Sequence, residues 1–246
     1  MRLEGKAALI TGVDASLGRQ IAVHFAREGA SVAGVGQTED GARAIEEIQQ
    51  AGGTGVYLEA DTSSRADAEK AVAGAIAAFG RIDVLVNYNP VRRILGTVVD
   101  MTDEEFDEQM TADIMRVVRL GRHAIPAMAK GGGGAVINIS SINSDGLKGR
   151  ALRSASKAAL NSLTIAMALD HGPQQIRVNA LVLGPVGASG GRGGEGGADP
   201  SPIGRVATVD QVAAAAVFLA SEEAAAITGV LLRIDGGRSL RPSDPN

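Results

Sequence analysis

The sequence predicts an α/β fold, a doubly wound parallel sheet with helices on both faces, formed as a single domain by residues 1–246. Three observations predict it. Short apolar runs alternate with segments of helical periodicity, the apolar residues are mostly small and aliphatic, and no break in composition marks a second domain. Hydrophobic residues make up 45% of the chain but aromatic residues only 2%, so the core has to be built from alanine, valine, isoleucine and leucine. That composition suits a buried parallel sheet.

Seven apolar runs are the expected strands, and they cover residues 7–12, 31–36, 55–61, 83–88, 135–141, 177–185 and 229–237. Segments with the period of an amphipathic helix follow the first several of them, such as residues 17–30 and 65–80. In the second of these segments one helical face carries Ala71, Val72, Ala75, Ile76 and Phe79. Strands and helices that alternate at this spacing indicate parallel strands joined by right-handed crossovers.

Composition also narrows the functions. The formal net charge of −4 gives no reason to expect nucleic acid or an anionic membrane as a partner. The absence of cysteine excludes disulfides, thiolate metal sites and thiol nucleophiles. His24, His123 and His171 show no metal-ligand spacing, so no metal site is predicted. The first apolar run is too short for a signal peptide and no later run is long enough to span a bilayer, so we expect a soluble, cytoplasmic protein.

Two glycine-rich stretches fall between these elements. Residues 130–135 are predicted to end a helix before a buried strand, because glycine tolerates positive φ. Residues 187–198 follow the carboxyl end of a strand, where ligands bind in such sheets. A lid over a ligand and a tolerated flexible loop are the two alternatives for this segment, and its position favours the lid.

The first strand runs directly into a glycine turn and a helix start, in the stretch LITGVDASLGRQIA, residues 9–22. Glycines at such a turn let backbone N–H groups approach a pyrophosphate at the positive end of the helix. Gly12 and Gly18 are present, whereas Ser16 stands where a middle glycine would allow the closest approach. A strand-to-helix turn without a ligand is the alternative.

Together with later motifs, this turn resembles the short-chain dehydrogenase/reductase family. The resemblance runs from Lys6 to about Leu240 and is carried by TGVDASLG, Asp61 after the third strand, DVLVN ending at Asn87, INISS, SASKAAL, RVNALVLGPV and ITGVLLRIDGG. It implies a Rossmann-like fold, a nicotinamide cofactor and oxidation or reduction of a small molecule. The family usually forms dimers or tetramers through two long helices, so the resemblance also implies a homodimer or homotetramer in which residues 156–172 pack against a partner helix. An amphipathic helix that packs only on its own sheet is the alternative for this segment.

The resemblance places the cofactor against residues at the carboxyl ends of the strands. Those expected to line its site are Gly12, Ser16, Leu17, Gly18, Gln37, Asp61, Thr62, Asn87, Lys157, Pro185 and Val186. In the family, the residue matching Asp61 holds the adenine and that matching Asn87 supports its ribose. NAD-using members commonly carry an acid after the second strand, where Gly36 and Gln37 stand here. Its absence favours NADP(H) over NAD(H), although no basic residue is present for the 2′-phosphate and Asp14 lies nearby; a chain that binds neither is the remaining alternative.

The family's catalytic groups are an asparagine, a serine, a tyrosine and a lysine. Lys157 is retained, and the serine is Ser141 or, because the following loop is one residue short, Ser140. Arg153 replaces the tyrosine and Asp113 replaces the asparagine. A guanidinium stays charged and is a poor proton donor, so conventional tyrosine-dependent carbonyl reduction is doubtful.

Charge suggests how the altered site is arranged. An Asp113–Arg153 ion pair near Lys157 is the hypothesis, because a buried arginine without a partner is costly; the alternative is an Arg153 that turns to solvent. Both loops that border the substrate cleft in the family are basic here, which suggests an anionic substrate; solvated loop residues without a role in binding are the alternative. The residues concerned are Arg92, Arg93, Lys148 and Arg150.

Three functions are compatible with this pattern. The first is a small-molecule enzyme without hydride transfer, in which Arg153, Lys157 and a serine stabilise an enolate or oxyanion. The second is an NADP(H)-dependent oxidoreductase whose proton comes from Tyr88, a bound water or the substrate itself. The third is a non-catalytic subunit that stabilises or regulates an active relative.

Overall fold

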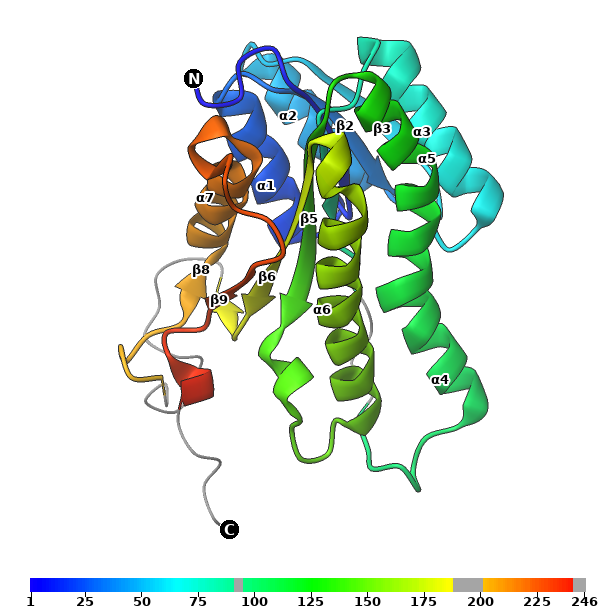
Figure 1. Cartoon of the computed structure of the whole chain (residues 1–246), viewed down its shortest axis with the longest axis vertical. Helices are drawn as coiled ribbons and strands as arrows, with labels where there is room; N and C mark the ends of the chain where they lie inside the picture. The colour runs from blue at the N-terminus through cyan, green and yellow to red at the C-terminus, as the bar shows by residue number, and fades with distance from the viewer. Residues whose placement is uncertain (91–94, 188–200, 241–246) are drawn as a thin grey trace.

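In the computed structural model, residues 1–90, 95–187 and 201–240 are described. The seven predicted strands form one parallel sheet in the order β3-β2-β1-β4-β5-β6-β9. Figure 1 labels β2, β3, β5, β6 and β9 of this sheet. They are β1 (Ala7–Thr11), β2 (Ser31–Gly36), β3 (Gly55–Glu59), β4 (Val84–Asn87), β5 (Gly134–Ser141), β6 (Ile176–Leu183) and β9 (Leu231–Ile234). The prediction of a doubly wound α/β sheet is therefore confirmed.

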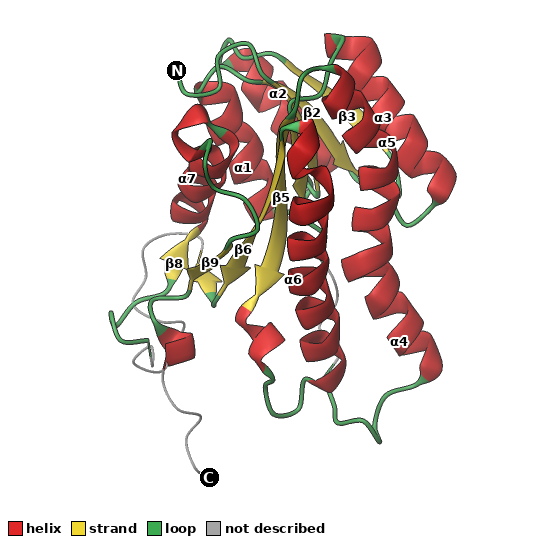
Figure 2. Ribbon diagram, viewed as in Figure 1, coloured by secondary structure: helices red, strands yellow, loops and turns green. Residues whose placement is uncertain are grey.

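Helices cover both faces of the sheet (Figure 2). One face carries α1 (Ser16–Arg27), α2 (Glu39–Gln50) and α7 (Val209–Ala220), and the other carries α3 (Arg65–Phe79), α5 (Arg116–Lys130) and α6 (Ala151–His171). Helix α4 (Asp103–Met110) leads into α5 through a π-helical turn, Thr111–Met115. A short parallel pair, β7 (Val186–Gly187) with β8 (Ala207–Thr208), lies beyond β6.

The alternation of strand side chains explains the two cores. In β1, Ala8 and Ile10 pack under α1 and α7, whereas Leu9 packs under α3 and α5 on the other face. In β4, Val86 packs on the face covered by α1 and α7, and Leu85 packs on the face covered by α3 and α5. Because side chains alternate between the faces, a strand buried on both sides reads as a continuous apolar run. This is why the strand positions could be predicted from the sequence.

Candidate active site

The carboxyl ends of the strands border two hollows. The larger hollow, of about 430 Å³, is lined by the ends of β5 and β6, the start of α1 and the first turns of α6. The smaller hollow, of about 260 Å³, lies over the ends of β1 and β2. Tyr88, Asn89 and Pro90 line both hollows, so the segment after β4 lies between them. In parallel α/β sheets this edge is where ligands bind.

Helix α1 presents an uncapped N-terminus to the larger hollow. Its N-cap residue Ala15 makes no side-chain hydrogen bond, and the first turn holds no acid. Helices α3, α4 and α7 are instead capped by Ser64, Thr102 and Thr208. Because the first N–H groups of a helix have no partner inside it, an uncapped start is a ready site for an anion.

The glycine turn before α1 is tightly packed. Gly12 has φ +69°, and a Cβ there would lie 2.6 Å from the carbonyl oxygen of Tyr88. A Cβ at Gly18 would lie 2.1 Å from the carbonyl oxygen of Gly12. Both predicted glycines are therefore required by the turn itself, while Ser16 and Leu17 line the larger hollow at the helix start.

A buried ion pair lies at the base of the larger hollow. Lys157 Nζ is 2.7 Å from Asp113 Oδ1, and the two side chains are 6% and 0% exposed. Lys157 also donates to the carbonyl oxygen of Ile139 at 3.1 Å. Burial lowers the pKa of Lys157, the charge of Asp113 opposes this shift, and the nearby positive charge of Arg153 adds to it. Lys157 lines the hollow, whereas Asp113 stands behind it on the π-helical turn.

The expected Asp113–Arg153 ion pair was wrong. The structure shows no such pair within the described residues, because Asp113 is engaged elsewhere. One carboxylate oxygen faces Lys157, and the other accepts hydrogen bonds from Gln109 Nε2 at 2.5 Å and Ser156 Oγ at 2.7 Å. Sequence reasoning missed Gln109 and Ser156, since neither belongs to the family's catalytic set.

Arg153 lines the larger hollow from the first turn of α6. Its Nη1 is fully buried and has no hydrogen-bond partner. The alternative of an arginine that turns to solvent is therefore also wrong. Arg153 is the one basic side chain in the described part of the chain that has an unpartnered, buried terminal guanidinium nitrogen.

Both serines line the larger hollow, but their hydroxyls differ. Ser140 is buried and its Oγ has no partner. Ser141 Oγ accepts a hydrogen bond from Asn143 Nδ2 at 2.8 Å at the start of a short 3-10 helix, Ile142–Asp145. Ser140 is thus the hydroxyl whose hydrogen bonds are unused.

The residues predicted for the adenine side are only partly assembled. Gln37 and Thr62 line the smaller hollow. Asp61 does not line this hollow and is ion-paired with Arg116, which does; Arg116 Nη2 is 3.1 Å from Asp61 Oδ1. Asn87 lines neither hollow among the described contacts: its buried side chain donates to Asn138 Oδ1 at 2.8 Å and ties β4 to β5. Asn87 Oδ1 is buried and has no described hydrogen-bond partner, so the ribose role expected of Asn87 stays a prediction.

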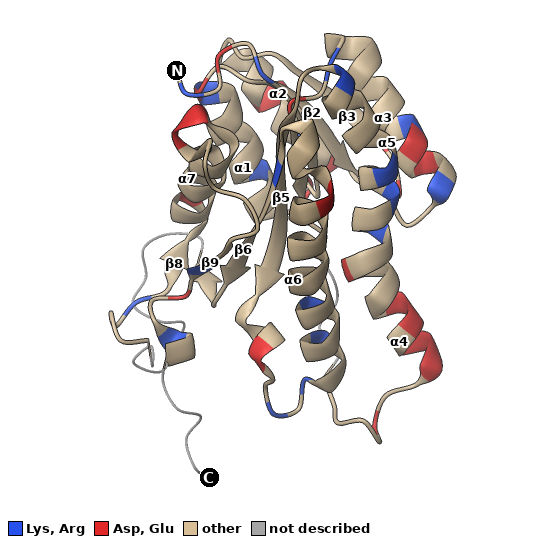
Figure 3. Ribbon diagram, viewed as in Figure 1, with Lys and Arg blue, Asp and Glu red and all other residues tan. Residues whose placement is uncertain are grey.

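The lining of the larger hollow is positively charged. Arg150, Arg153, Lys157 and Arg238 line it, and none of the described lining residues is Asp or Glu. Figure 3 shows basic residues at the start of α6 and a run of acidic residues on α4. Lys148 is exposed and does not contribute. Arg92 and Arg93 lie outside the described residues, as does the expected lid apart from Gly187, which lines the hollow beside Pro185 and Val186.

Proteins similar to this chain in sequence and fold are named as oxidoreductases, reductases or dehydrogenases. A family model described as enoyl-(acyl carrier protein) reductase matches residues 12–239. An uncharacterized oxidoreductase of Thermotoga maritima is 34% identical over 251 residues, which cover 96% of this chain and 98% of the relative. The chain belongs to the short-chain dehydrogenase/reductase family.

Two further comparisons agree with this assignment. The 3-oxoacyl-[acyl-carrier-protein] reductase FabG of Escherichia coli is 34% identical over 243 residues, covering 96% of this chain and 98% of the relative. The structure of a mutant short-chain dehydrogenase/reductase of Serratia marcescens matches with a TM-score of 0.89 and 31% identity, covering 97% of this chain and all of that one (100%).

Members of this family typically bind NAD(H) or NADP(H), and the residues present in this short-chain dehydrogenase/reductase fit such a group. The uncapped start of α1 would hold the pyrophosphate through its N–H groups, and the residues that line the two hollows beside residues 88–90 would hold the rest of the dinucleotide. Lys157 and the loop at Pro185 border the larger hollow.

No group of three or more potential metal ligands is found among the described residues. Within the same residues, no helix has the length and apolar character needed to cross a bilayer.

Proposed function

We propose that this chain is a nicotinamide-dependent oxidoreductase that interconverts a small carbonyl compound and the corresponding alcohol, with Arg153 holding the substrate oxygen. One observation carries the proposal: Arg153 Nη1 and Ser140 Oγ are both buried without a partner, and both residues line the larger hollow. Buried polar groups are normally hydrogen-bonded, so two orphaned groups in one cavity mark the place of a ligand.

The guanidinium supplies charge rather than a proton. A carbonyl oxygen gains negative charge as hydride reaches its carbon, and a fixed cation beside it stabilises that charge most strongly in a site with little water. Ser140 donates a second hydrogen bond to the same oxygen. The cofactor supplies the hydride, and Lys157 lies at the base of the hollow, held by Asp113.

The proton that completes reduction comes from Tyr88 in this proposal. Tyr88 lines both hollows, and its hydroxyl makes no hydrogen bond to a described residue. Burial raises the pKa of Tyr88, and the charge of Arg153 opposes that shift. The phenol is therefore protonated at neutral pH but is a weaker acid than a free tyrosine, so it gives up its proton only as negative charge develops on the substrate oxygen.

The comparisons weigh against the redox-neutral enzyme that the sequence favoured, because the relatives are named as reductases and dehydrogenases. The preference for NADP(H) and the proposal of an anionic substrate stay predictions. The basic lining of the larger hollow supports the second, and a substrate with a carboxylate or phosphate is included in the proposal on that ground. A homo-oligomer through α6 is also proposed, since Ile165 and Leu169 are exposed on that helix.

The test combines nucleotide binding with a substrate screen. Calorimetric titration of protein freed of carried-over nucleotide is expected to show micromolar binding of NADH or NADPH. A panel of oxo acids and uncharged ketones, followed by nicotinamide absorbance, should then reveal turnover. Arg153→Met is expected to lower kcat/KM by about 10²–10³-fold, and Tyr88→Phe to lower kcat by about 10²–10⁴-fold.

Arg122→Met is the matched control, because Arg122 is exposed on α5 away from both hollows. It is expected to leave turnover unchanged. No binding of either nucleotide at millimolar concentration would contradict the proposal and favour a non-catalytic subunit. Full activity of Arg153→Met would remove the role given to the guanidinium.

A further inference from the structure

We infer that Arg150 binds a carboxylate of the substrate, so that the chain acts on an oxo acid whose carboxylate lies several bonds from the reacting carbonyl. The inference rests on the proposed function and deepens it, because Arg153 holds the reacting oxygen and Arg150 becomes the residue that selects the substrate. The carboxylate takes no part in hydride or proton transfer. Three features of the start of α6 support the inference: a row of cations, an unfavourable helix cap and a fixed backbone.

Three cations lie in a row at the start of α6, and all of them line the larger hollow. They are Arg150, Arg153 and Lys157, and residues three or four positions apart are neighbours on a helix. Lys157 is neutralised by Asp113, whereas neither arginine makes a side-chain hydrogen bond or ion pair with a described residue. Ser140, which is 3% exposed, lines the same hollow with an unpartnered Oγ. The two arginines therefore face a cavity that has room and hydrogen-bonding capacity for an anionic ligand.

The start of α6 is an unfavourable place for arginine. Arg150 is the N-cap residue, it makes no side-chain capping hydrogen bond, and the first turn contains no acid. An N-cap side chain normally accepts a hydrogen bond from the first N–H groups, but a guanidinium has no acceptor. The N-terminus of a helix also carries partial positive charge, which a cation beside it makes less favourable. A bound anion would relieve this repulsion, and such local conflicts are expected at functional sites.

The backbone of Arg150 is fixed by the neighbouring segment. The N–H of Gly96 donates to the carbonyl oxygen of Gly149 at 3.0 Å, and the N–H of Ala151 donates to the carbonyl oxygen of Gly96 at 3.4 Å. These bonds flank Arg150 on both sides. A side chain on a backbone that is already ordered loses less freedom when it binds a ligand, so Arg150 is suited to selecting one group of the substrate.

Charge and spacing define the class of ligand. With Lys157 paired and Arg153 facing the reacting oxygen, the charge of Arg150 is left for a second group. A single carboxylate balances that charge and matches the planar guanidinium through two parallel hydrogen bonds. Arg150 and Arg153 are separated by about one helical turn, roughly 5.4 Å along the axis. In a 2-oxo acid both groups would fall on Arg153, whereas an oxo acid with a longer spacing reaches both arginines.

The experiment is steady-state kinetics of the full chain at saturating nucleotide, with 4-oxopentanoate, 2-oxopentanoate and pentan-2-one as matched substrates. The kcat/KM for 4-oxopentanoate is expected to exceed each of the other two by at least about tenfold. Arg150→Met should raise the KM for 4-oxopentanoate by about 10–100-fold with little change in kcat, because the lost interaction is made in both the ground state and the transition state. Its effect on pentan-2-one, which has no carboxylate, should be far smaller. Arg150→Lys keeps the charge and should recover part of the loss.

Lys148→Met is the matched control, since Lys148 carries the same charge in the same loop but is exposed and does not line the hollow. It should leave the KM for 4-oxopentanoate unchanged. Calorimetric titration with 4-oxopentanoate in the presence of oxidised nucleotide reads binding without turnover, and it should show the same loss of affinity in Arg150→Met.

The outcomes separate this inference from the proposed function. Equal kcat/KM for 4-oxopentanoate and pentan-2-one, a preference for 2-oxopentanoate, or equal effects of Arg150→Met and Lys148→Met would overturn the inference and leave the proposed function intact. A wild type that does not bind 4-oxopentanoate would do the same. A wild type that binds no nucleotide, yet binds 4-oxopentanoate more tightly than Arg150→Met does, would overturn the proposed function and keep the carboxylate site.

Discussion

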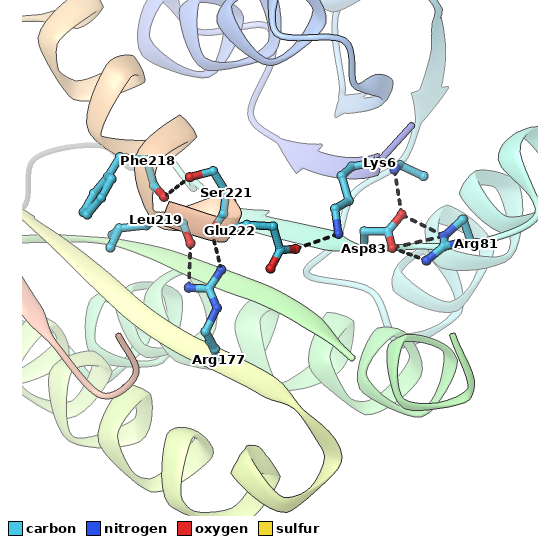
Figure 4. A network of polar contacts seen from close by, with 9 residues as sticks. Lys6, Arg81, Asp83, Arg177, Phe218, Leu219, Ser221 and Glu222 are labelled. Atoms are coloured by element: carbon cyan, nitrogen blue, oxygen red, sulfur yellow. Dashed lines mark hydrogen bonds and ion pairs between the residues drawn. The ribbon is translucent and has the colours of Figure 1, made fainter. Parts of the chain in front are cut away.

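The two ends of the sheet both hold cavities and charged side chains, yet they differ in how the charges are partnered. At the amino end, a cavity of about 460 Å³ is bordered by Lys6, Arg81, Asp83, Arg177 and Glu222. Each of them is partnered, as Figure 4 shows: Lys6 Nζ lies 3.1 Å from Glu222, and Arg81 Nη2 lies 2.6 Å from Asp83. The cavity at this end is about as large as the larger hollow at the carboxyl end, but its charged side chains are paired with other groups of the protein.

The contrast is sharpest between two arginines. Arg177 donates to the carbonyl oxygens of Leu219 at 2.7 Å and Ser221 at 3.2 Å, and so caps the C-terminal end of α7. Arg153, at the carboxyl end, keeps a buried Nη1 without a partner. Cavity volume therefore does not separate a site from a structural gap here. Unused hydrogen-bonding capacity does, because a fold does not gain stability by burying an unpaired group.

The largest expected effect on stability comes from the buried ion pair under the larger hollow. Asp113→Asn leaves Lys157 buried without a counter-charge, and Lys157→Met leaves the carboxylate in the same position. Each change is expected to lower the free energy of unfolding by about 3–5 kcal/mol. Urea denaturation of the two single variants and of the double variant measures this.

The double variant should lose less than the sum of the single losses, by at least about 1 kcal/mol, because the second change removes the group stranded by the first. Strict additivity of the two losses would show that the two charges do not stabilise each other in the folded protein.

A smaller loss is expected at the amino end. Arg177→Met removes the donors from the carbonyl oxygens at the end of α7, so the free energy of unfolding should fall by about 2–3 kcal/mol. Nucleotide binding at the other end of the sheet should be unchanged in calorimetric titration. If Arg177→Met weakened nucleotide binding without loss of stability, the division between the two ends would be mistaken.

The smallest expected effect is a pH dependence of stability. It tests whether a charged pair that lies near the site, but is fully partnered, behaves as part of the scaffold. Arg233 donates to Asp145 at 3.0 Å near the carboxyl end, and this guanidinium holds the pKa of Asp145 below its usual value. Because the pKa is lowered by folding, the pair stabilises the protein above the unfolded pKa, and this contribution disappears as pH falls through the folded value. Both side chains are about two-fifths exposed (41% and 39%), so we expect no more than about 1 kcal/mol.

Comparison of wild type and Asp145→Asn by chemical denaturation checks this. The wild type should be the more stable at neutral pH, and the difference should vanish in strong acid. A difference that grows in acid would contradict the assigned direction of the shift. With the expected result, a paired charge near the site behaves as part of the scaffold, as the comparison requires.

The fold could be predicted because its signals are local. Each strand is a short apolar run that can be recognised from a few neighbouring residues. The location of Lys157, Arg153 and the serines at one edge also followed from the strand order. These positions depend on topology, which the resemblance supplied.

Side-chain partners could not be predicted, because they depend on geometry between distant segments. Asp113 and Arg153 are a natural pair by charge, but the π-helical turn directs Asp113 to Lys157 and Ser156. Asp14 accepts a hydrogen bond from the backbone N–H of Gln37, which lies 23 positions further along the chain, and only the pairing of β1 with β2 brings them together. In each case the sequence identified the chemical groups and the fold determined their partners.

The most direct test of the central claim is the free energy of unfolding of Arg153→Met, measured by urea denaturation without nucleotide. If Arg153 is held for a ligand, removing its unpaired guanidinium should leave stability within about 0.5 kcal/mol of the wild type, or raise it. A loss of about 2 kcal/mol or more, comparable to that expected for Arg177→Met, would contradict the account and make Arg153 a structural residue.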